Sequence, residues 1–533
     1  MTPCSSIRQT IPKNLSTPVV VRDDKVALSG LDVLADFWSG RNLAFRRRPI
    51  DINGENRYEI LRVVSSVVEP TSTSKRPRFG TVTEPARQVD VIHETDVLVV
   101  GSGPAGLAAA LAAARAGVAV TLVERFGCFG GNITAVGVEG FAWYRHEQTV
   151  EANGIGREFE IRAAAAGAAV PESQSLSFEI DAEGFKVVAD RMVEEAGIDA
   201  MLHRQFVSPI MEGTSVVGII TESKAGREAI RARRVIDATG DADIAFRAGA
   251  PTHLTAREHM MATSVMFHLA GVDKKSFIEG IKADPQTYRD WSGNGEWSIE
   301  TSGKEDDMFS PFLHKPFAKA IESGLITSSS VATLGGTWGA VHDTGELTYM
   351  NLVFVGGVDG TDPDDLTRGE IEGRRAAMHA IEALRAYTPG CESARLRNFG
   401  MTVGIRDTRK IDAAYNMTEH DVREQARFDD SIGIYPEFID GYGVLILPTT
   451  GRYFHVPYRN MLPKTVTNLL VAGRSSGGDR ISHAATRNMS CCAVLGQGAG
   501  IAAALSLHHS TELDQVDINA VQTELDRQGV RYR

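Results

Sequence analysis

The sequence TDVLVVGSGPAG occupies residues 95–106 and joins a short apolar run to three glycines. The run 95–100 predicts a buried strand, and the alanine-rich segment 107–116 predicts a helix. In a G-x-G-x-x-G turn between a strand and a helix, the first glycine permits the tight turn, the second admits a pyrophosphate and the third lets helix and strand pack. The helix amides and the macrodipole would then face the phosphates.

A second strand is predicted at 118–123, and Glu124 follows it, 23 positions after Gly101. This matches the spacing of about 20 residues at which a carboxylate bonds the ribose of a dinucleotide. Strand, glycines, alanine helix, second strand and acid together predict a dinucleotide-binding domain.

Three further motifs favour FAD over NAD. The glycine pair in GCFGGN (127–132) follows Glu124 closely, where FAD proteins run along the ribityl chain. The segment RVIDATGDAD (234–243) is a strand that ends in an Ala-Thr-Gly turn. The strand NLLVAGR (468–474) is followed by GQGAG (496–500), which opens a helix of small residues.

In these motifs the chain resembles the FAD-dependent oxidoreductases of the glutathione-reductase-like superfamily. One such family reads roughly IPYR-x-L-x-P, NLLVAGR, an arginine and GQAAG-x-AAAL in its C-terminal part. Here VPYRNMLP stands at 456–463, NLLVAGR at 468–474, an arginine at Arg487 and GQGAGIAAAL at 496–505. The resemblance covers about 95–510 and implies an α/β fold: a discontinuous, Rossmann-like three-layer FAD-binding domain, an inserted α+β substrate or cap domain, and an N-terminal extension.

The implied domains alternate along the chain. They are an N-terminal arm (1–92), FAD-binding segments (93–135, 184–250 and 461–510), cap or substrate segments (136–183 and 251–460) and a C-terminal tail (511–533). Further elements are expected as strands at 202–208, 216–221 and 234–238, and as helices at 184–196, 368–387 and 493–506.

The resemblance implies a set of FAD contacts along these motifs. The residues expected to touch the cofactor are Gly101, Gly103, Pro104, Ala105, Gly106, Glu124, Arg125, Gly130, Gly131, Asn132, Val207, Thr239, Gly240, Asp241, Gly473, Arg474 and Gly498. Val207 would offer its backbone to the adenine, and a helix starting near Gly500 would present its N-terminus to the flavin. Cys128 precedes the glycine pair, and no histidine or tyrosine follows it, so we expect noncovalent FAD.

Candidate catalytic residues lie in loops expected to face the flavin. His483, in the segment 474–492, is a candidate general base near neutral pH, with a hydrogen bond to FAD or backbone as the alternative. Arg406 and Arg409, in GIRDTRK (404–410), suit a carboxylate or the carbonyl edge of the flavin, or a structural ion-pair network.

Tyr453 and His455 alternate with the period of a strand, so both could face one cavity. The cap region 250–395 also contains Trp338, His342 and Tyr349.

We therefore predict an FAD-dependent oxidoreductase that oxidises or reduces a small organic substrate by hydride transfer at flavin N5. One alternative is a flavin-dependent monooxygenase or halogenase-like hydroxylase, which usually shows G-D-A-x-H-x-x-x-P; here Asp241-Ala242-Asp243-Ile244 lacks that histidine. A second alternative is a flavin-binding assembly or sensor protein, with a site closed over the flavin. The clusters of tyrosine, histidine and arginine argue against the latter.

The composition argues against several classes of binding partner and cofactor. The 533 residues have a net charge of −12, which argues against a general nucleic-acid or anionic-membrane binder. Five cysteines without a C-x-x-C spacing predict neither a disulfide scaffold nor a metal site. The most apolar stretch, 96–123, is interrupted by Arg115 and Gly117, and the first 25 residues lack the apolar centre of a signal peptide, so we expect a cytoplasmic protein without a membrane span.

Residues 1–92 differ from the rest, with 14 basic and 10 acidic residues. The triplet Arg46–Arg48 and the stretch PTSTSKRPRFG (70–80) predict an exposed arm and a linker. The segments 26–38 and 58–68 are apolar enough to dock on the body or on a second subunit, which makes the arm a candidate contact in a homo-oligomer.

Overall fold

The computed structural model describes residues 49–52, 55–58, 79–141, 145–146, 150–171, 178–286, 298–300, 312–329, 331–448 and 451–533. The chain divides into two compact units, Met1–Ser72 and Thr73–Arg533. In the first unit, β1 (Pro49–Ile52) pairs with β2 (Glu55–Tyr58) in antiparallel fashion. The basic triplet 46–48, the segment 26–38 and nearly all of 58–68 lie outside the described residues, so the predicted docking of the arm stays a prediction.

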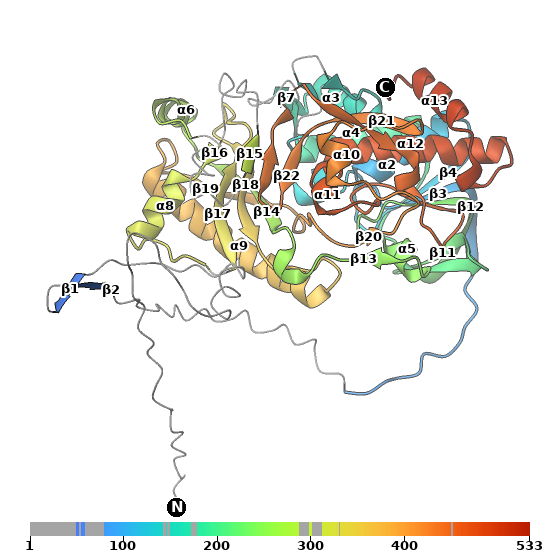
Figure 1. Ribbon diagram of the computed structural model, residues 1–533, viewed down its shortest axis with the longest axis horizontal. Helices are drawn as coiled ribbons and strands as arrows, with labels where there is room; N and C mark the ends of the chain where they lie inside the picture. The colour runs from blue at the N-terminus through green and yellow to red at the C-terminus, as the bar shows by residue number, and fades with distance from the viewer. Residues whose placement is uncertain are drawn as a thin grey trace, which may run out of the picture. The chain divides into compact units, whose positions relative to one another are not determined.

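One part of the second unit is built on a parallel sheet, at the right in Figure 1. Its strands are β3 (Val91–Val100), β4 (Val120–Val123), β9 (Asp199–Met201), β12 (Gly226–Asp237) and β25 (Leu469–Val471). They lie in the order β25-β12-β3-β4-β9, and every neighbouring pair is parallel. The carboxyl ends of these strands therefore share one edge, where ligands bind in sheets of this kind.

The long strand β12 also belongs to an antiparallel meander. Its first half pairs with β11 (Ser215–Ser223), which pairs with β10 (Gln205–Glu212). Its second half enters the parallel sheet beside β3.

Helices α2 (Pro104–Arg115) and α12 (Met489–His508) pack against each other beside the parallel sheet. Their backbones approach closely, because a Cβ at Gly496 would overlap the carbonyl oxygen of Ala105. Helix α12 is long and apolar enough to cross a membrane, but 94% of its most apolar window is buried inside the protein. It is thus built like the core helix of a globular domain.

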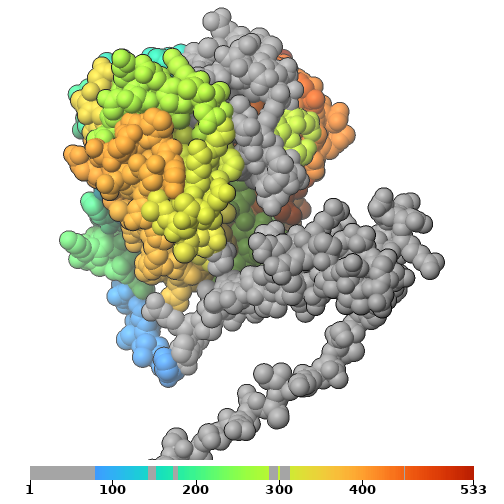
Figure 2. All heavy atoms as spheres, turned by 90° about the vertical axis from the view of Figure 1, so that its left-hand side faces the viewer, coloured from blue at the N-terminus to red at the C-terminus, as the bar shows by residue number. Residues whose placement is uncertain are grey.

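A second sheet is assembled from residues within 251–460. Its antiparallel strands are, in order, β16 (Phe312–Leu313), β17 (Ala332–Thr337), β18 (Leu347–Val355), β14 (Thr263–Ala270) and β19 (Arg395–Phe399). Helix α9 (Pro363–Tyr387) lies against this sheet, next to α8 (Lys315–Glu322). Figure 2 views the molecule from this side, and the surface facing the viewer is largely yellow to orange, the colours of this region.

The remaining elements connect or flank the two sheets. They are β5 (Arg145–His146), β6 (Val150–Glu151), α3 (Ile155–Ala165), β7 (Ala169–Pro171), β8 (Phe178–Ile180), α4 (Ala182–Glu195), α5 (Asp243–Arg247), β13 (Thr252–His253), α6 (Lys274–Ala283), β15 (Ser298–Glu300), β20 (Lys410–Ile411), α10 (Glu419–Arg423), β21 (Ser431–Pro436), β22 (Ile439–Gly441), β23 (Val444–Ile446), β24 (Tyr453–Pro457), α11 (Arg480–Thr486) and α13 (Ile518–Arg527).

One irregularity in the second sheet points toward the site. Phe267 of β14 pairs with Met350, whereas Leu269 pairs with Leu347, so β18 contains one extra residue between these pairs. Within this bulge Tyr349 has a φ of 50°, which a bulky residue rarely adopts. The bulge thereby changes the direction of the Tyr349 side chain relative to a regular strand.

The predicted elements are present, with boundaries moved by a few residues. Helix 368–387 begins five residues earlier, because Pro363 occupies its first turn and the Asp362 side chain accepts a hydrogen bond from the amide of Asp364. The helix expected to start near Gly500 begins at Met489 instead. Gly500 lies inside α12, where a Cβ would overlap the carbonyl oxygen of Ala109.

Candidate active site

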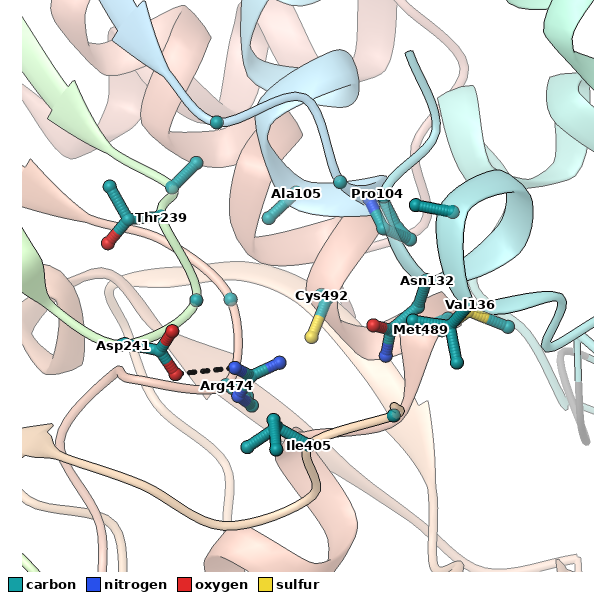
Figure 3. Close-up of a pocket in the computed structure, with 18 of the residues that line it drawn as sticks. Pro104, Ala105, Asn132, Val136, Thr239, Asp241, Ile405, Arg474, Met489 and Cys492 are labelled. Carbon is teal, nitrogen blue, oxygen red and sulfur yellow. Dashed lines mark hydrogen bonds and ion pairs between the residues drawn. The ribbon is translucent and has the colours of Figure 1, made fainter. Parts of the chain in front are cut away.

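One cavity connects the carboxyl edge of the parallel sheet with the second sheet. The cavity has a volume of about 290 Å³, near the lower end of the roughly 300–1,000 Å³ of a typical small-ligand pocket. Figure 3 shows that loops from both domains surround it, with Pro104 and Thr239 on one side and Ile405 on the other. Because its lining comes from both the parallel sheet and the second sheet, the cavity can contain both a dinucleotide part and a second part.

The glycine turn at the start of α2 forms the first wall. Gly101 has a φ of 95°, and a Cβ there would overlap the carbonyl oxygen of Ala238. Gly131 lies directly opposite, because its Cβ would come 2.5 Å from the Cα of Gly103. Gly103 caps α2 without a side-chain hydrogen bond, so no side chain caps the first amides of the helix. This is the geometry of a phosphate site.

Glu124 stands at the end of β4, with only 5% of its surface exposed. Its Oε2 accepts hydrogen bonds from the amide of Ser102 at 2.8 Å and from the Ser102 hydroxyl at 2.7 Å. Its Oε1 accepts from the amide of Phe126 at 2.9 Å. The carboxylate is therefore held in one orientation in the cavity wall, and Oε1, which accepts a single bond, retains acceptor capacity for a ribose hydroxyl.

The turn after β12 is organised by Asp237. This buried carboxylate accepts hydrogen bonds from the amide and hydroxyl of Thr239 at 3.1 and 2.7 Å, and from the amides of Ile244 and Ala245 at 2.9 and 3.0 Å. Burial raises the pKa of Asp237 to about 6. The network sets the turn that presents Thr239, Gly240 and Asp241 to the cavity.

Arg474 is the third residue after the end of β25 at Val471, and it pairs with Asp241 in the wall of the cavity (Figure 3). Its Nη2 donates to Asp241 Oδ1 at 2.5 Å, and the same oxygen accepts from the Thr408 hydroxyl at 2.9 Å. The Nε of Arg474 is buried and has no hydrogen-bond partner in the described part of the chain. An unused guanidinium donor beside a phosphate-binding turn fits an anionic or carbonyl-bearing cofactor.

Most residues predicted to contact the cofactor line this cavity. They are Gly101, Gly103, Pro104, Ala105, Glu124, Arg125, Gly131, Asn132, Thr239, Gly240, Asp241, Gly473 and Arg474.

Four predicted cofactor residues lie outside the lining. Gly106 packs α2 against the turn, Gly130 lies against Thr134, and Gly498 packs α12 against Ile432 of β21. The carbonyl of Val207 accepts a hydrogen bond from Arg247, whereas its neighbours Gln205 and Phe206 line the cavity.

His483 lies behind the cavity wall, with 2% of its surface exposed. Its Nε2 is 3.0 Å from the carbonyl oxygen of Arg406 and 3.9 Å from Asp407 Oδ1. Burial, with the nearby Lys410 cation, lowers the pKa of His483 to about 3. The structure thus places this imidazole where it supports the Arg406 segment, not where it reaches into the cavity.

The other histidine and tyrosine candidates also lie away from the cavity lining. His455 Nδ1 accepts from the amide of Phe428 at 3.2 Å, and the ring stacks on Tyr453 with centroids 6.4 Å apart. Arg427 stands 4.1 Å above the ring of Tyr453. Tyr453 and His455 do share one face, as the period of two predicts, but that face meets Arg427 and Phe428.

The two predicted arginines, Arg406 and Arg409, have different surroundings. Arg409 donates to the Asp241 carbonyl at 3.0 Å and pairs with Asp243 at 2.9 Å, so it belongs to the ion-pair network behind the turn. Arg406 lines the cavity. Its Nη2 is 3.4 Å from Asn351 Oδ1, and its guanidinium carbon lies 4.6 Å above the ring of Phe354.

Several cavity residues were not among the predicted site residues. They are Ser102, Tyr349, Asn351, Asp440, Arg487, Asn488 and Met489. Arg487 was visible in sequence as the arginine of the C-terminal motif, and Tyr349 only as an aromatic residue of the cap region. Asn488 and Met489 stand at the first turn of α12, whose cap has no side-chain hydrogen bond. The N-terminus of α12 therefore opens on the cavity.

The chain is similar in sequence to known proteins. A family model described as FAD dependent oxidoreductase matches residues 96–525. Among curated proteins, the chain is 30% identical over 207 residues to the digeranylgeranylglycerophospholipid reductase of Methanoculleus marisnigri, covering 36% of this chain and 51% of that protein. It is 26% identical over 365 residues to the reductase of the same name from Methanosphaerula palustris, covering 62% and 87%. The chain thus spans about half the length of the first of these relatives.

Solved structures give a more distant likeness. A geranylgeranyl bacteriochlorophyll reductase-like protein from Thermoplasma acidophilum aligns at 14% identity with a TM-score of 0.41, covering 82% of this chain and 84% of that chain. The p-nitrophenol 4-monooxygenase of Pseudomonas putida aligns at 13% identity with a TM-score of 0.41, covering 82% and 87%.

The family match spans most of the chain and includes every loop that forms the dinucleotide half of the cavity. The glycine turn, the unused Arg474 donor and the buried Glu124 carboxylate all fit FAD. The chain therefore belongs to the FAD-dependent oxidoreductase family, and its cofactor is FAD.

Proposed function

We propose that this enzyme transfers a hydride between FAD and a small polar organic substrate held where the cavity meets the second sheet. The observation that carries the proposal is the continuity of the cavity. One space is lined by the carboxyl ends of β25, β12, β3 and β4, and also by Tyr349, Asn351 and Arg406. Cofactor loops and cap residues that share one space are suited to bring two ligands together.

The chain's own residues would position the cofactor. The first amides of α2 would bind the pyrophosphate, and Glu124 would accept from the ribose. The N-terminus of α12, near Asn488 and Met489, would stabilise negative charge on the flavin ring. When bound, the flavin supplies a site that accepts or donates a hydride at N5.

The residue that exchanges a proton with the substrate would differ from the histidines that the sequence predicts. Among the described residues, no histidine lines the cavity. Tyr349 and Asp440 are protonatable side chains in its lining, and the bulge in β18 positions Tyr349. We propose that Tyr349 exchanges the proton where the substrate requires one, with His483 and His455 supporting the backbone.

A small polar substrate is favoured over an isoprenoid lipid. The relatives are named as reductases of digeranylgeranylglycerophospholipid, whose chains would need a long apolar wall. The lining of this cavity instead includes the polar side chains of Arg406, Arg487 and Asn351.

The test is anaerobic. The oxidised holoenzyme is mixed with a panel of alcohols, amines and organic acids, and bleaching of the visible flavin absorbance identifies a reductant. The chemically reduced enzyme is mixed with alkenes, including geranylgeranylated lipid, and reoxidation identifies an acceptor. Turnover of the lipid alone would contradict a small polar substrate, and product formation only with oxygen would favour the monooxygenase alternative. Failure of every compound in both directions would favour a non-enzymatic flavoprotein.

A further inference from the structure

The lining of the cavity contains two guanidinium groups with few polar partners among the described residues. Arg406 precedes β20, and Arg487 ends α11, yet both line the same cavity. Among the described residues, the Arg406 guanidinium has one hydrogen bond, to Asn351 Oδ1 at 3.4 Å, near the limit of such a contact. A guanidinium carries five N–H donors, so most of its capacity is unused.

Arg487 is also incompletely satisfied. Its Nη2 donates to the Asp440 carbonyl at 2.5 Å and to Asp440 Oδ2 at 3.0 Å. Its Nε is buried and has no hydrogen-bond partner in the described ranges. The Arg487 side chain is 10% exposed, so water reaches this group poorly. A buried donor without a partner costs free energy, and more when it is charged, and a ligand that accepts from it would recover that cost.

The local charge is also unbalanced. Asp440 is the carboxylate that faces both arginines, so two cations share one anion. Burial lowers the pKa of Arg406 to about 10, with a smaller contribution from repulsion by Arg487. Arg406 nevertheless stays a cation at neutral pH. Two planar, charged donors with one shared counter-ion match a planar anion.

We propose that Arg406 and Arg487 together bind a carboxylate of the substrate, so that the enzyme acts on an organic acid. This inference rests on the proposed function, because it assigns the substrate class of the same cavity. Asn351, which contacts Arg406, and Asp440, which pairs with Arg487, would hold the two guanidinium groups in place. The substrate carboxylate would supply the missing anion.

The experiment measures ligand binding without turnover. Oxidised holoenzyme is titrated with acetate, benzoate and succinate and with their uncharged amides, and the shift of the visible flavin spectrum is recorded. We expect saturable binding of at least one acid and about tenfold or weaker binding of its amide. Arg406→Gln and Arg487→Gln should each weaken acid binding by about 10- to 100-fold, the loss of one charge-assisted bond, with the FAD content unchanged. Arg406→Lys should recover only part, because it keeps the charge but loses the planar fork.

The matched control is Arg375→Gln on α9, an exposed arginine paired with Glu372, which should leave acid binding unchanged. Equal binding of acids and amides, or no spectral change with any acid, would overturn the inference. Loss of FAD from the Arg406 or Arg487 variants would also overturn it, because the arginines would then serve the flavin's carbonyl edge. None of these results tests the proposal of hydride transfer. That proposal is contradicted only if no organic compound exchanges electrons with the bound flavin.

Discussion

The carboxylate of Glu124 accepts two hydrogen bonds from Ser102, one from its amide at 2.8 Å and one from its hydroxyl at 2.7 Å. Ser102, which lies between Gly101 and Gly103, therefore ties the turn that we propose binds phosphate to the acid that we propose binds ribose, at the end of the next strand. Neither part can shift without the other.

Glu124→Ala should weaken FAD binding by about 10- to 100-fold, because a charge-assisted hydrogen bond is worth roughly 1.5–3 kcal/mol. Ser102→Ala should weaken binding less, since the Ser102 amide and the Phe126 amide still orient the carboxylate. The measurement is the dissociation constant of FAD for apoprotein of each variant. Equal FAD affinity in Glu124→Ala and the parent would reject the assigned role.

A pH dependence of stability should follow from His483. Its pKa falls from 6.5 to about 3 on folding, so the unfolded chain binds more protons between these values. The stabilisation is present above pH 6.5 and is lost as the pH falls toward about 3. His483→Gln should make the melting temperature fall less steeply across this window than in the parent. Parallel curves for parent and variant would contradict the buried, neutral state of His483.

The same variant separates the two roles considered for His483. Glutamine can still donate to the Arg406 carbonyl, so we expect the rate of flavin reduction by substrate to stay within about tenfold of the parent. A loss of about 10²–10⁴-fold with FAD still bound would instead support general acid–base catalysis. Stopped-flow absorbance of the flavin distinguishes the two outcomes.

The buried pair of Lys410 and Asp407 should matter for stability. Nζ and Oδ1 are 2.6 Å apart, and the side chains are 1% and 0% exposed. Lys410→Met leaves Asp407 without its cation and should cost about 3–5 kcal/mol of unfolding free energy. The surface pair Lys464–Asp412 has the same 2.6 Å separation but is 48% and 37% exposed, so Lys464→Met should cost about 1 kcal/mol or less. Equal losses in the two variants, measured by denaturant unfolding, would contradict this account.

The contact of α2 with α12 should tolerate no added carbon. Gly496→Ala places a Cβ on the carbonyl oxygen of Ala105 and should destabilise the protein by about 1–3 kcal/mol, although alanine favours a helix. Gly369→Ala in α9 is the control, because its Cβ would meet only Val358 methyl groups at 3.2 and 3.3 Å. Its effect should stay within about 1 kcal/mol. A stabilised Gly496→Ala variant would show that the two helices can separate at little cost.

The dinucleotide half of the site could be predicted from sequence because its residues act locally. Gly101 and Glu124 each follow a strand directly, and adjacent parallel strands bring their ends to one edge. Arg406 was also predicted, and it lines the cavity. The direction in which a side chain points within a loop could not be predicted from the sequence. His483 and Arg406 lie 77 positions apart, and nothing in either segment predicts that the imidazole meets the Arg406 carbonyl.

The half of the cavity that we propose binds substrate depends on tertiary contacts, and the sequence predicted few of its residues. Tyr349 enters the cavity through an extra residue in β18, which its strand-like sequence does not signal. Phe206 lines the cavity and its neighbour Val207 does not, because the pairing of β10 with β11 shifts between Phe206 and Ser208. A slip of one residue in a strand exchanges its two faces.

The close fit of α12 against α2 has a consequence for biosynthesis. Residues 104–115 are translated well before residues 489–508. The second sheet is encoded between them and has a core of its own, so it can fold while the nucleotide-binding half is still incomplete. Contacts this distant in sequence close slowly. The start of α12, which lines the cavity, is therefore added only after the second sheet has been translated, and until then the face of α2 that contacts α12 lacks its partner helix.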